Sequence, residues 1–548
     1  MQNYQLTIGA ILRHGQMIYG DSTVVSVGSA GRQSISFADV ALRAKRLAAG
    51  LRALGVGPGD RIATLGFNTQ AHLEAYLAVP SMGAVLHTAN PRLHASELAY
   101  TIQHAGDRVL LVDAELVDAV TAILPQLPTV EHVVVVASSA NAERAAVPQA
   151  LRRSVDEHAT QYRSYEDILA PAHSAAPWPV LDENAPAIIC YTSGTTGEPK
   201  GVVYSHRALY LHSLGLTSAA SLGLSERDRV LPIVPMFHAN AWGLPYAAWF
   251  VGADLVLPGR DVRASAMCEL IAAERPTFAA AVPTVWNDVL HYSTQSPVDL
   301  SSLRMILCGG AAVAGSLIDE FEARFAVPII QAWGMTETGP LAALAFAPKH
   351  LHGATSQQWR ARTGRVLPGI ELRLVGDGGE LPWDGAAVGE IEVRGPWCTG
   401  SYHHDPLPEK FDDGWLRTGD IGAVHPNGFI QITDRAKDVI KSGGEWISSV
   451  ELESALMAHP DVVEASVIGV PDPRWQERPL ACVVTRAGAN ITPQALRGFL
   501  ASRVARWWLP ERWSFVAEIP KTSVGKLDKK ALRARHASGA LTVHTWSE

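Results

Sequence analysis

The residues from Tyr191 to Gly201 have the types and the spacing that could bind a phosphate group. The segment reads Tyr-Thr-Ser-Gly-Thr-Thr-Gly-Glu-Pro-Lys-Gly and follows the apolar run at 187–190. Glycines and small hydroxyls after a buried strand present backbone N–H groups to a polyanion without side-chain bulk. The segment is not a Walker A loop, because Glu198 and Pro199 stand directly before Lys200 where that motif has glycine. By composition it is either a phosphate-binding loop or a flexible polar surface loop.

The composition describes a globular protein with more than one domain. The chain has 548 residues, which exceeds the size at which a single hydrophobic core stops growing. Hydrophobic residues make up 47% of the chain and charged residues 18%. The net charge of −8 argues against a nucleic-acid partner, which requires a basic face. An anionic ligand must therefore be held by a local site.

The cysteines and the apolar runs indicate a cellular compartment. The chain has five cysteines, an odd number, and none of them forms a C-x-x-C pair, which suits a reducing compartment. No apolar run reaches the roughly 18 to 20 residues of a membrane span. The N-terminus lacks the pattern of a secretory signal. We expect a cytoplasmic protein without a membrane span.

The first part of the chain alternates helical and strand patterns, which indicates crossover connections and mostly parallel sheets. The expected helices cover 36–51, 69–84 and 96–105, and the expected strands cover 61–66, 85–88 and 109–113. From Ser138 to about Pro179 the pattern fades, and we expect a surface excursion with one short helix at 147–155. Alternation then resumes and continues to 327–331.

The pattern of apolar and polar residues changes after Thr363. Short alternating runs such as 371–375 and 389–395 indicate antiparallel strands in a β-rich subdomain. After Arg435 the pattern is helix, strand, strand, helix, at 449–458, 464–470, 480–485 and 493–504. The sequence therefore predicts an α/β protein with a large N-terminal domain, 1–433, that contains the β-rich subdomain. A small α+β C-terminal domain, 434–548, follows a charged boundary at Asp434.

Five further motifs accompany the opening segment, and their residue types suit nucleotide chemistry. They read Val234-Pro-Met-Phe-His-Ala-Asn-Ala-Trp242, Gln331-Ala-Trp-Gly-Met-Thr-Glu-Thr338, Trp415-Leu-Arg-Thr-Gly-Asp420, Asp434-Arg-Ala-Lys-Asp-Val-Ile-Lys-Ser-Gly-Gly-Glu-Trp446 and Pro520-Lys-Thr-Ser-Val-Gly-Lys526. Each motif alone is weak, since a Thr-Glu pair is more often a helix cap and a Gly-Asp pair a turn. Together, in this order along nearly the whole chain, they resemble the adenylate-forming superfamily. The motif sequences are most similar to those of bacterial medium- and long-chain fatty-acyl-CoA synthetases.

The resemblance implies a reaction in two steps. A carboxylate first attacks the α-phosphorus of ATP in the presence of Mg2+ and gives an acyl-adenylate and pyrophosphate. The thiolate of CoA then displaces AMP. The implied partners are a small-molecule carboxylate, namely a fatty acid, together with ATP and CoA, and the resemblance leaves a homodimer open.

For the first step, the resemblance assigns the opening segment to the β- and γ-phosphates, through Thr192, Ser193, Gly194, Thr195, Thr196, Gly197 and Lys200. Thr192 and Glu337 would hold Mg2+, which prefers oxygen ligands. Thr336, Glu337 and His238 count among the catalytic residues that the resemblance implies. Lys526 would bridge the carboxylate and the α-phosphate as a point charge on a flexible stem. On its Gly-containing neighbourhood alone, Lys526 is a solvated surface lysine.

For the nucleoside, the resemblance implies that Asp420 accepts hydrogen bonds from the ribose hydroxyls, with Arg435 as a second contact. The backbone of Gly309, Gly310 and Ala311 would approach the adenine, Gln331 and Ala332 would flank it, and the aromatic face of Trp333 would stack on it. The family usually has tyrosine where this chain has Trp333. Stacking survives that change, whereas a contact of the tyrosine hydroxyl does not. The alternative is that Trp333 is simply a core residue.

For the acyl group, adenylation domains that take amino acids place an Asp early in the second motif to pair with the amine. This chain has Phe237 and His238 there, which favours an uncharged tail. By resemblance Trp242 would gate an apolar tunnel walled by 242–251, and His238 would line its carboxylate end. A satisfied core histidine is the alternative for His238.

For the second step, similar enzymes rotate a small, mobile C-terminal domain about a hinge at the position of Asp434. One face, with Lys526, would serve adenylation, and another, with Lys441 and Trp446, would serve thioester formation. Lys437 would contact a nucleotide phosphate.

Three other functions stay open from the sequence. Two are enzymes on the same scaffold: an acyl-adenylating ligase that loads a carrier protein, and a CoA ligase for short-chain, aryl or methylthio carboxylates. The third is a non-catalytic binding relative, which the presence of Lys526, Glu337, Asp420 and Thr192 argues against. The length of the acyl chain depends on the depth of the tunnel and cannot be read from the sequence.

Overall fold

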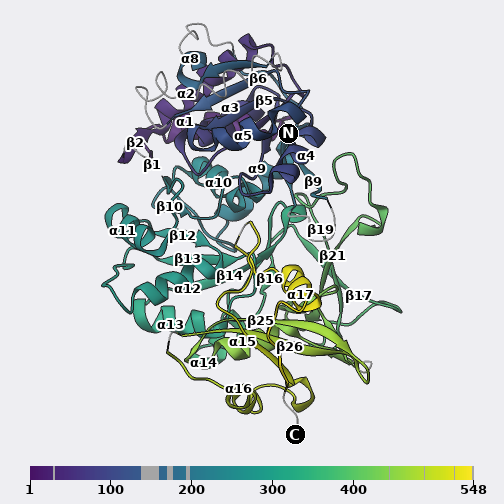
Figure 1. Cartoon of the computed structure of the whole chain (residues 1–548). Helices are drawn as coiled ribbons and strands as arrows, with labels where there is room; N and C mark the ends of the chain where they lie inside the picture. The colour runs from purple at the N-terminus through teal and green to yellow at the C-terminus, as the bar shows by residue number, and fades with distance from the viewer. Residues whose placement is uncertain are drawn as a thin grey trace.

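The computed structural model of the chain describes residues 1–28, 31–137, 160–169, 177–192, 198–442, 445–486, 488–523 and 525–545. Figure 1 shows two α/β sheets, coloured purple to teal, stacked above a green β-rich part and a yellow-green C-terminal part. The expected short helix at 147–155 lies outside the described residues.

The first sheet has the strand order β7-β6-β5-β3-β4-β8-β9 and is parallel except for β9. Its strands are β3 (Arg61–Leu65), β4 (Val85–Thr88), β5 (Asp107–Asp113), β6 (His132–Val136), β7 (Gln161–Ser164), β8 (Pro186–Tyr191) and β9 (Gly201–Ser205). The helices of this part are α2 (Phe37–Ala53), α3 (Gln70–Ser81), α4 (Ala95–Ala105), α5 (Val117–Ile123), α8 (Tyr165–Leu169) and α9 (His206–Thr217). The segment expected to bind phosphate thus begins directly after β8.

The second sheet has the order β16-β15-β14-β13-β12-β10-β11-β1-β2, with antiparallel strands at both edges of a parallel centre. Its strands are β1 (Thr23–Gly28), β2 (Gly31–Ser36), β10 (Arg229–Pro232), β11 (Asp254–Leu257), β12 (Phe278–Ala281), β13 (Met305–Gly309), β14 (Ile329–Gly334), β15 (Leu341–Leu344) and β16 (Arg365–Val366). The helices here are α1 (Ile8–Ile18), α10 (Leu244–Val251), α11 (Ala264–Glu274), α12 (Pro283–Tyr292), α13 (Gly315–Phe325) and α14 (Gly353–Arg360).

The predicted β-rich subdomain is present as an antiparallel sheet. Its strands are β17 (Glu371–Gly376), β18 (Gly379–Glu380), β19 (Gly389–Arg394), β20 (Phe411–Asp412), β21 (Trp415–Val424) and β22 (Ile430–Arg435). The last strand, β22, pairs with β21 and ends at the charged segment that the sequence analysis took as a boundary.

The C-terminal part has a sheet of its own. Its strands are β23 (Ile440–Ser442), β24 (Glu445–Ile447), β25 (Val462–Asp472), β26 (Gln476–Thr485), β27 (Arg512–Phe515) and β28 (His544–Thr545), and its helices are α15 (Ser449–Met457), α16 (Pro493–Leu500) and α17 (Lys529–Ala537). In Figure 1 a yellow segment next to α17 reaches back toward the teal and green elements. That segment carries the run Pro520-Lys-Thr-Ser523 as a loop, not as a helix or strand.

The buried side chains divide in the same way. One apolar cluster runs from the first sheet through the second and into the β-rich sheet, and within it the rings of Phe37 and Trp249 stack 4.1 Å apart. The C-terminal sheet has separate clusters around Trp513 and Leu480. The expected helices follow their caps, since the hydroxyl of Ser36 accepts from the amide of Asp39 at the start of α2.

Candidate active site

A cavity of about 300 Å3 lies at the carboxyl ends of strands from both α/β sheets, where they meet β21, the end of β22 and the loop that bears Lys526. Carboxyl ends of parallel strands are the usual place for a ligand in α/β sheets. The cavity brings together many of the residues singled out in the sequence, namely Thr192, Lys200, His238, Trp242, Gly309, Gly310, Ala332, Trp333, Thr336, Glu337, Arg435, Lys437 and Lys526.

Asp420 lies behind the cavity wall and is held from two sides. The indole Nε1 of Trp333 donates a hydrogen bond to Asp420 Oδ2 at 2.8 Å, and Arg435 Nε lies 3.1 Å from Oδ1. The pairing of β21 with β22 places Asp420 directly opposite Arg435, and the carboxylate of Asp420 raises the pKa of Arg435. Each carboxylate oxygen has a second lone-pair direction, so Asp420 can still accept from a hydroxyl.

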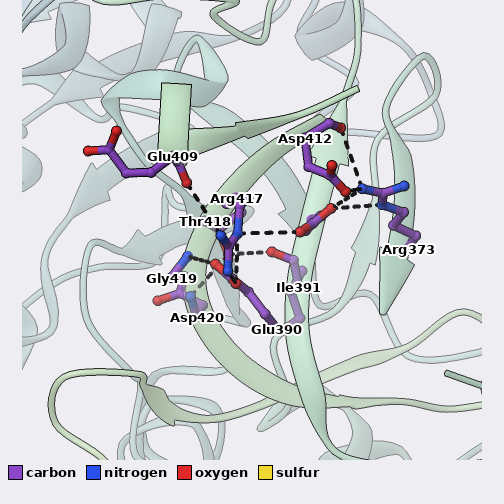
Figure 2. Close-up of polar contacts among 10 residues, drawn as sticks. Arg373, Glu390, Ile391, Glu409, Asp412, Arg417, Thr418, Gly419 and Asp420 are labelled. Carbon is purple, nitrogen blue, oxygen red and sulfur yellow. Dashed lines mark hydrogen bonds and ion pairs between the residues drawn. The ribbon is translucent and has the colours of Figure 1, made fainter. Parts of the chain in front are cut away.

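The strand that carries Asp420 is fixed by polar contacts with β19 (Figure 2). Thr418 Oγ1 donates to the carbonyl of Ile391 at 2.6 Å and accepts from the amide of Asp420 at 3.1 Å. The amide of Gly419 donates to Glu390 Oε1 at 3.1 Å, and the same carboxylate pairs with Arg417 at 2.7 Å. These contacts set the position of Asp420 before any ligand binds.

Glu337 is a buried carboxylate at the edge of the cavity. It belongs to the short 3-10 turn Thr336–Thr338, which directly follows β14. The hydroxyl of Tyr402 donates to Glu337 Oε1 at 2.7 Å, and the hydroxyl of Tyr204 donates to the carbonyl of Thr336 at 2.6 Å. Two tyrosines from distant parts of the chain therefore orient this turn.

The chemistry of this edge fits Mg2+. Glu337 supplies carboxylate oxygens and Thr192 a hydroxyl, and both residues line the cavity. In the described part of the chain, no group of three His, Cys, Asp or Glu side chains converges to hold a metal by itself. Mg2+ is commonly bound through one or two carboxylates together with the phosphates of a substrate, and Glu337 with Thr192 fits that pattern.

The cavity wall includes an unusual turn that follows His238 and contains Trp242. Burial, together with the nearby charge of Lys526, lowers the pKa of His238 to about 3, so the imidazole is neutral at pH 7. The turn Ala239–Gly243 follows, and its residues have φ angles between 43° and 77°. Left-handed backbone costs non-glycine residues free energy, and such strain is concentrated at functional sites. Trp242 is buried by this turn and faces the cavity.

Lys526 is the group that the C-terminal part contributes to the cavity. Burial and the neighbouring cation Arg435 lower the pKa of Lys526 to about 8, against the opposing effect of Asp420 and Glu337. Gly310 permits the approach, because a Cβ atom at that position would lie 3.3 Å from Lys526 Cε and Gly310 has a φ of +81°. The lysine is therefore not a freely solvated surface residue.

Several residues singled out in the sequence lie elsewhere. Ala311 is exposed beyond the cavity, and Gln331 is buried, where its Oε1 accepts from the amide of Val313. Lys441 and Trp446 pair across β23 and β24, both side chains are exposed, and neither lines the cavity. The phosphate-loop residues Ser193, Gly194, Thr195, Thr196 and Gly197 lie outside the described residues.

Asp434, the expected hinge, is a buried residue at the end of β22. Its Oδ2 accepts hydrogen bonds from both the amide and the hydroxyl of Ser449 on α15, and its Oδ1 accepts from the amide of Arg435. The carboxylate thus joins the β-rich sheet to the first helix of the C-terminal part.

Some residues of the cavity were not predicted from the sequence. Tyr402, which orients Glu337, and Lys410 both line it, as do Thr418 and Gly419. Thr418 and Gly419 belong to the motif Trp415–Asp420, in which only Asp420 was assigned a role from the sequence. Tyr402 lies in a stretch without periodicity, so only its proximity in the fold identifies it.

The chain is similar to known proteins over nearly its whole length. It matches the model of the AMP-binding enzyme family over residues 15–403 and the model of the AMP-binding enzyme C-terminal domain over residues 451–526. Among the described residues, none of the helices has the length and apolar character needed to cross a membrane.

Similar proteins cover nearly the whole chain. A long-chain-fatty-acid–CoA ligase from Thermus thermophilus is 46% identical over 98% of this chain and 96% of its own length. A medium-chain-fatty-acid–CoA ligase from Ectopseudomonas oleovorans is 40% identical over 98% and 97%. A crystal structure of an anthranilate CoA ligase with anthranoyl-AMP superposes with a TM-score of 0.87 at 26% identity, covering 98% of this chain and 99% of that chain.

Proposed function

The chain belongs to the family of AMP-binding enzymes, and from this premise we propose that it is an AMP-forming fatty-acyl-CoA synthetase. It activates a fatty acid with ATP to an acyl-adenylate and pyrophosphate, then transfers the acyl group to CoA and releases AMP. The observation that carries the proposal is the convergence of Lys526, Trp333 and Glu337 on one cavity, with Asp420 directly behind it.

The cavity suits the first step because two anions must meet there. The carboxylate of the fatty acid attacks the α-phosphorus of ATP, and pyrophosphate leaves. The ammonium group of Lys526 offsets the negative charge that gathers on the reacting oxygens. Asp420 accepts hydrogen bonds from the ribose, and Trp333, which Asp420 holds in place, offers a ring face to the adenine. Lys437 and Arg435 line the same cavity, and we propose that they contact the phosphates.

We propose that Thr192 and Glu337 hold Mg2+ at the phosphate end of the cavity. When bound, the ion neutralises charge on the phosphate oxygens. The role of the chain is to orient Glu337, which the hydrogen bond from Tyr402 does. The segment at 193–197 is proposed to bind the β- and γ-phosphates.

The acyl end of the cavity suits an uncharged tail. Val234, Val282 and Leu341 contribute apolar surface there, and His238 is neutral. Trp242, on its left-handed turn, is proposed to close the path to the tail pocket. The named substrates of the two similar ligases, fatty acids of long and medium chain, agree with this reading.

For the second step we propose that the C-terminal domain, 434–548, turns about Asp434. The face that carries Lys441 and Trp446 would then replace Lys526 at the cavity. The exposure of both residues away from the cavity supports a second arrangement, because it leaves them free for another contact.

We also propose a cytoplasmic location, supported by five free cysteines in the described chain. A homodimer remains a proposal from the family resemblance. Size-exclusion chromatography with light scattering tests it directly.

The function is tested by measuring pyrophosphate release from ATP with a series of carboxylates that have from about two to about eighteen carbons. We expect activity with medium or long chains and formation of the CoA thioester. Thioester formation only on a carrier protein would favour the acyl-adenylating ligase. If no carboxylate supports the release of pyrophosphate from ATP, the proposal that the protein is an adenylating enzyme is refuted.

A further inference from the structure

The loop that carries Lys526 contacts the N-terminal domain at points outside the cavity. Asn90 Nδ2 donates a hydrogen bond to Ser523 Oγ at 3.0 Å. Arg92 Nη1 donates to the carbonyl of Ser523 at 3.4 Å, and Thr284 Oγ1 donates to the carbonyl of Gly525 at 3.5 Å. Ser523 and Asn90 are 433 positions apart in the sequence, so these contacts depend entirely on how the two domains are arranged.

The N-terminal side of this contact is held independently of the loop. Asn90 follows β4, and its Oδ1 accepts from the amide of Arg92 at 3.0 Å, which closes a local turn. The guanidinium of Arg92 lies 5.4 Å from the ring centroid of Phe237, the residue before His238. Asn90 and Arg92 are therefore each held by a contact within the N-terminal domain.

On the other side, the loop is closed on itself. The amide of Thr522 donates to the carbonyl of Lys526 at 2.7 Å, and the amide of Lys526 donates to Thr522 Oγ1 at 3.2 Å. The amide of Gly525 donates to the carbonyl of Thr522 at 2.9 Å. Because these bonds join the two ends of the loop, fixing Ser523 also fixes the position of Lys526.

We propose that Asn90 is a positioning residue for adenylation, which acts by holding Ser523 and thereby Lys526 at the cavity. This inference rests on the proposed function, in which Lys526 serves the first step only. The contact does not touch a substrate. Since the second step requires the loop to leave, the Asn90–Ser523 bond favours the first step and opposes the second.

The two steps can be measured separately with Ser523→Ala. This variant removes Oγ but keeps the backbone carbonyl that Arg92 binds. We expect carboxylate-dependent pyrophosphate release to slow by about fivefold, the effect of one neutral hydrogen bond. Thioester formation from supplied acyl-adenylate and CoA should be unchanged or faster.

A double-mutant cycle identifies the partner. Asn90→Ala alone should slow adenylation at least as much as Ser523→Ala, because it also removes the acceptor of the Arg92 amide, and the double variant should lose no more than Asn90→Ala alone. Ser502→Ala, at an exposed serine of the same domain whose hydroxyl contacts only its neighbour Arg503 in the described chain, should keep wild-type rates in both steps.

Equal losses in both steps, additive losses in the double variant, or wild-type adenylation by Ser523→Ala would each overturn the inference. The wild-type enzyme separates this failure from failure of the proposed function. If the wild type releases no pyrophosphate with any fatty acid, both are refuted. If it does and the variants are indistinguishable from it, only the role of Asn90 is refuted.

Discussion

Lys526 combines a positive charge with surroundings that disfavour that charge. Its pKa is lowered to about 8, chiefly by burial and then by Arg435. A lysine is charged below its pKa and neutral above it, so the group that offsets the charge of the reacting anions is lost as the pH rises. We expect kcat/KM for pyrophosphate release to fall about tenfold per pH unit above pH 8, measured between pH 6 and 10.

The control for this profile is Lys526→Ala. The variant should retain little adenylation and show no descending limb near pH 8, while it still forms the thioester from supplied acyl-adenylate. A limb of the same shape in the variant would assign the titration to another group.

Trp333 has two functions that one substitution separates. Its ring faces the cavity, and its Nε1 donates to Asp420. Trp333→Phe keeps an aromatic face and removes the donor to a charged acceptor, a contact worth about 1.5 to 3 kcal/mol. We expect KM for ATP to rise at least about tenfold with a smaller change in kcat. An unchanged KM would mean that Trp333 is a core residue without a role in nucleotide binding.

At the level of elements, the left-handed turn Ala239–Gly243 is the least expected feature of the site. A glycine normally signals positive φ in a sequence, yet four of these five residues are not glycine. The turn is stabilised by its surroundings: Asn240 is fully buried and its Oδ1 accepts from Tyr76, which comes from α3. The sequence located the motif but gave no indication of its backbone.

Gly243→Ala tests this turn. Gly243 has a φ of +77°, and a Cβ there would lie 2.5 Å from the ring of His212. We expect the free energy of unfolding to fall by about 2 to 4 kcal/mol, because the alanine has a left-handed backbone and is overpacked against His212. We also expect a higher KM for the fatty acid. Gly223→Ala is the matched control, because Gly223 has a φ of +59° but open space around it. The free energy of unfolding of this control should fall by only about 1 kcal/mol, and its KM for the fatty acid should be unchanged.

Thermal unfolding and fatty-acid kinetics of the two variants provide the measurement. Equal destabilisation of both would show that the contact with His212 is relieved by movement of the ring. The turn would then be less constrained than its packing indicates.

The elements themselves were largely readable from local patterns. The expected helix at 36–51 is α2, the expected strand at 85–88 is β4, and the expected helix at 449–458 is α15, each within two residues at its ends. Caps and periodicity act over a few residues and are written in the sequence. The contact of Glu337 with Tyr402 and that of Trp333 with Asp420 span 65 and 87 positions, so they required the fold.

At the level of the whole molecule, the described arrangement fits the first of the two proposed steps. Lys526 is at the cavity and is held there through Ser523, whereas Trp446 is 41% exposed on a hairpin away from it. Part of the Trp446 ring is therefore open to a further contact. Its place in a Lys-Ser-Gly-Gly-Glu-Trp motif, at the start of the C-terminal domain, favours a contact made only after that domain has turned.

Trp446→Ala therefore has an expected effect opposite to that of Lys526→Ala. Pyrophosphate release should match the wild type, and thioester formation from supplied acyl-adenylate should fall at least about tenfold, because the second arrangement loses an aromatic contact. Trp475→Ala is the matched control, since Trp475 is also 41% exposed in the same domain. It should leave both steps unchanged. If Trp446→Ala slowed adenylation as much as thioester formation, the assignment of two faces to two steps would be wrong.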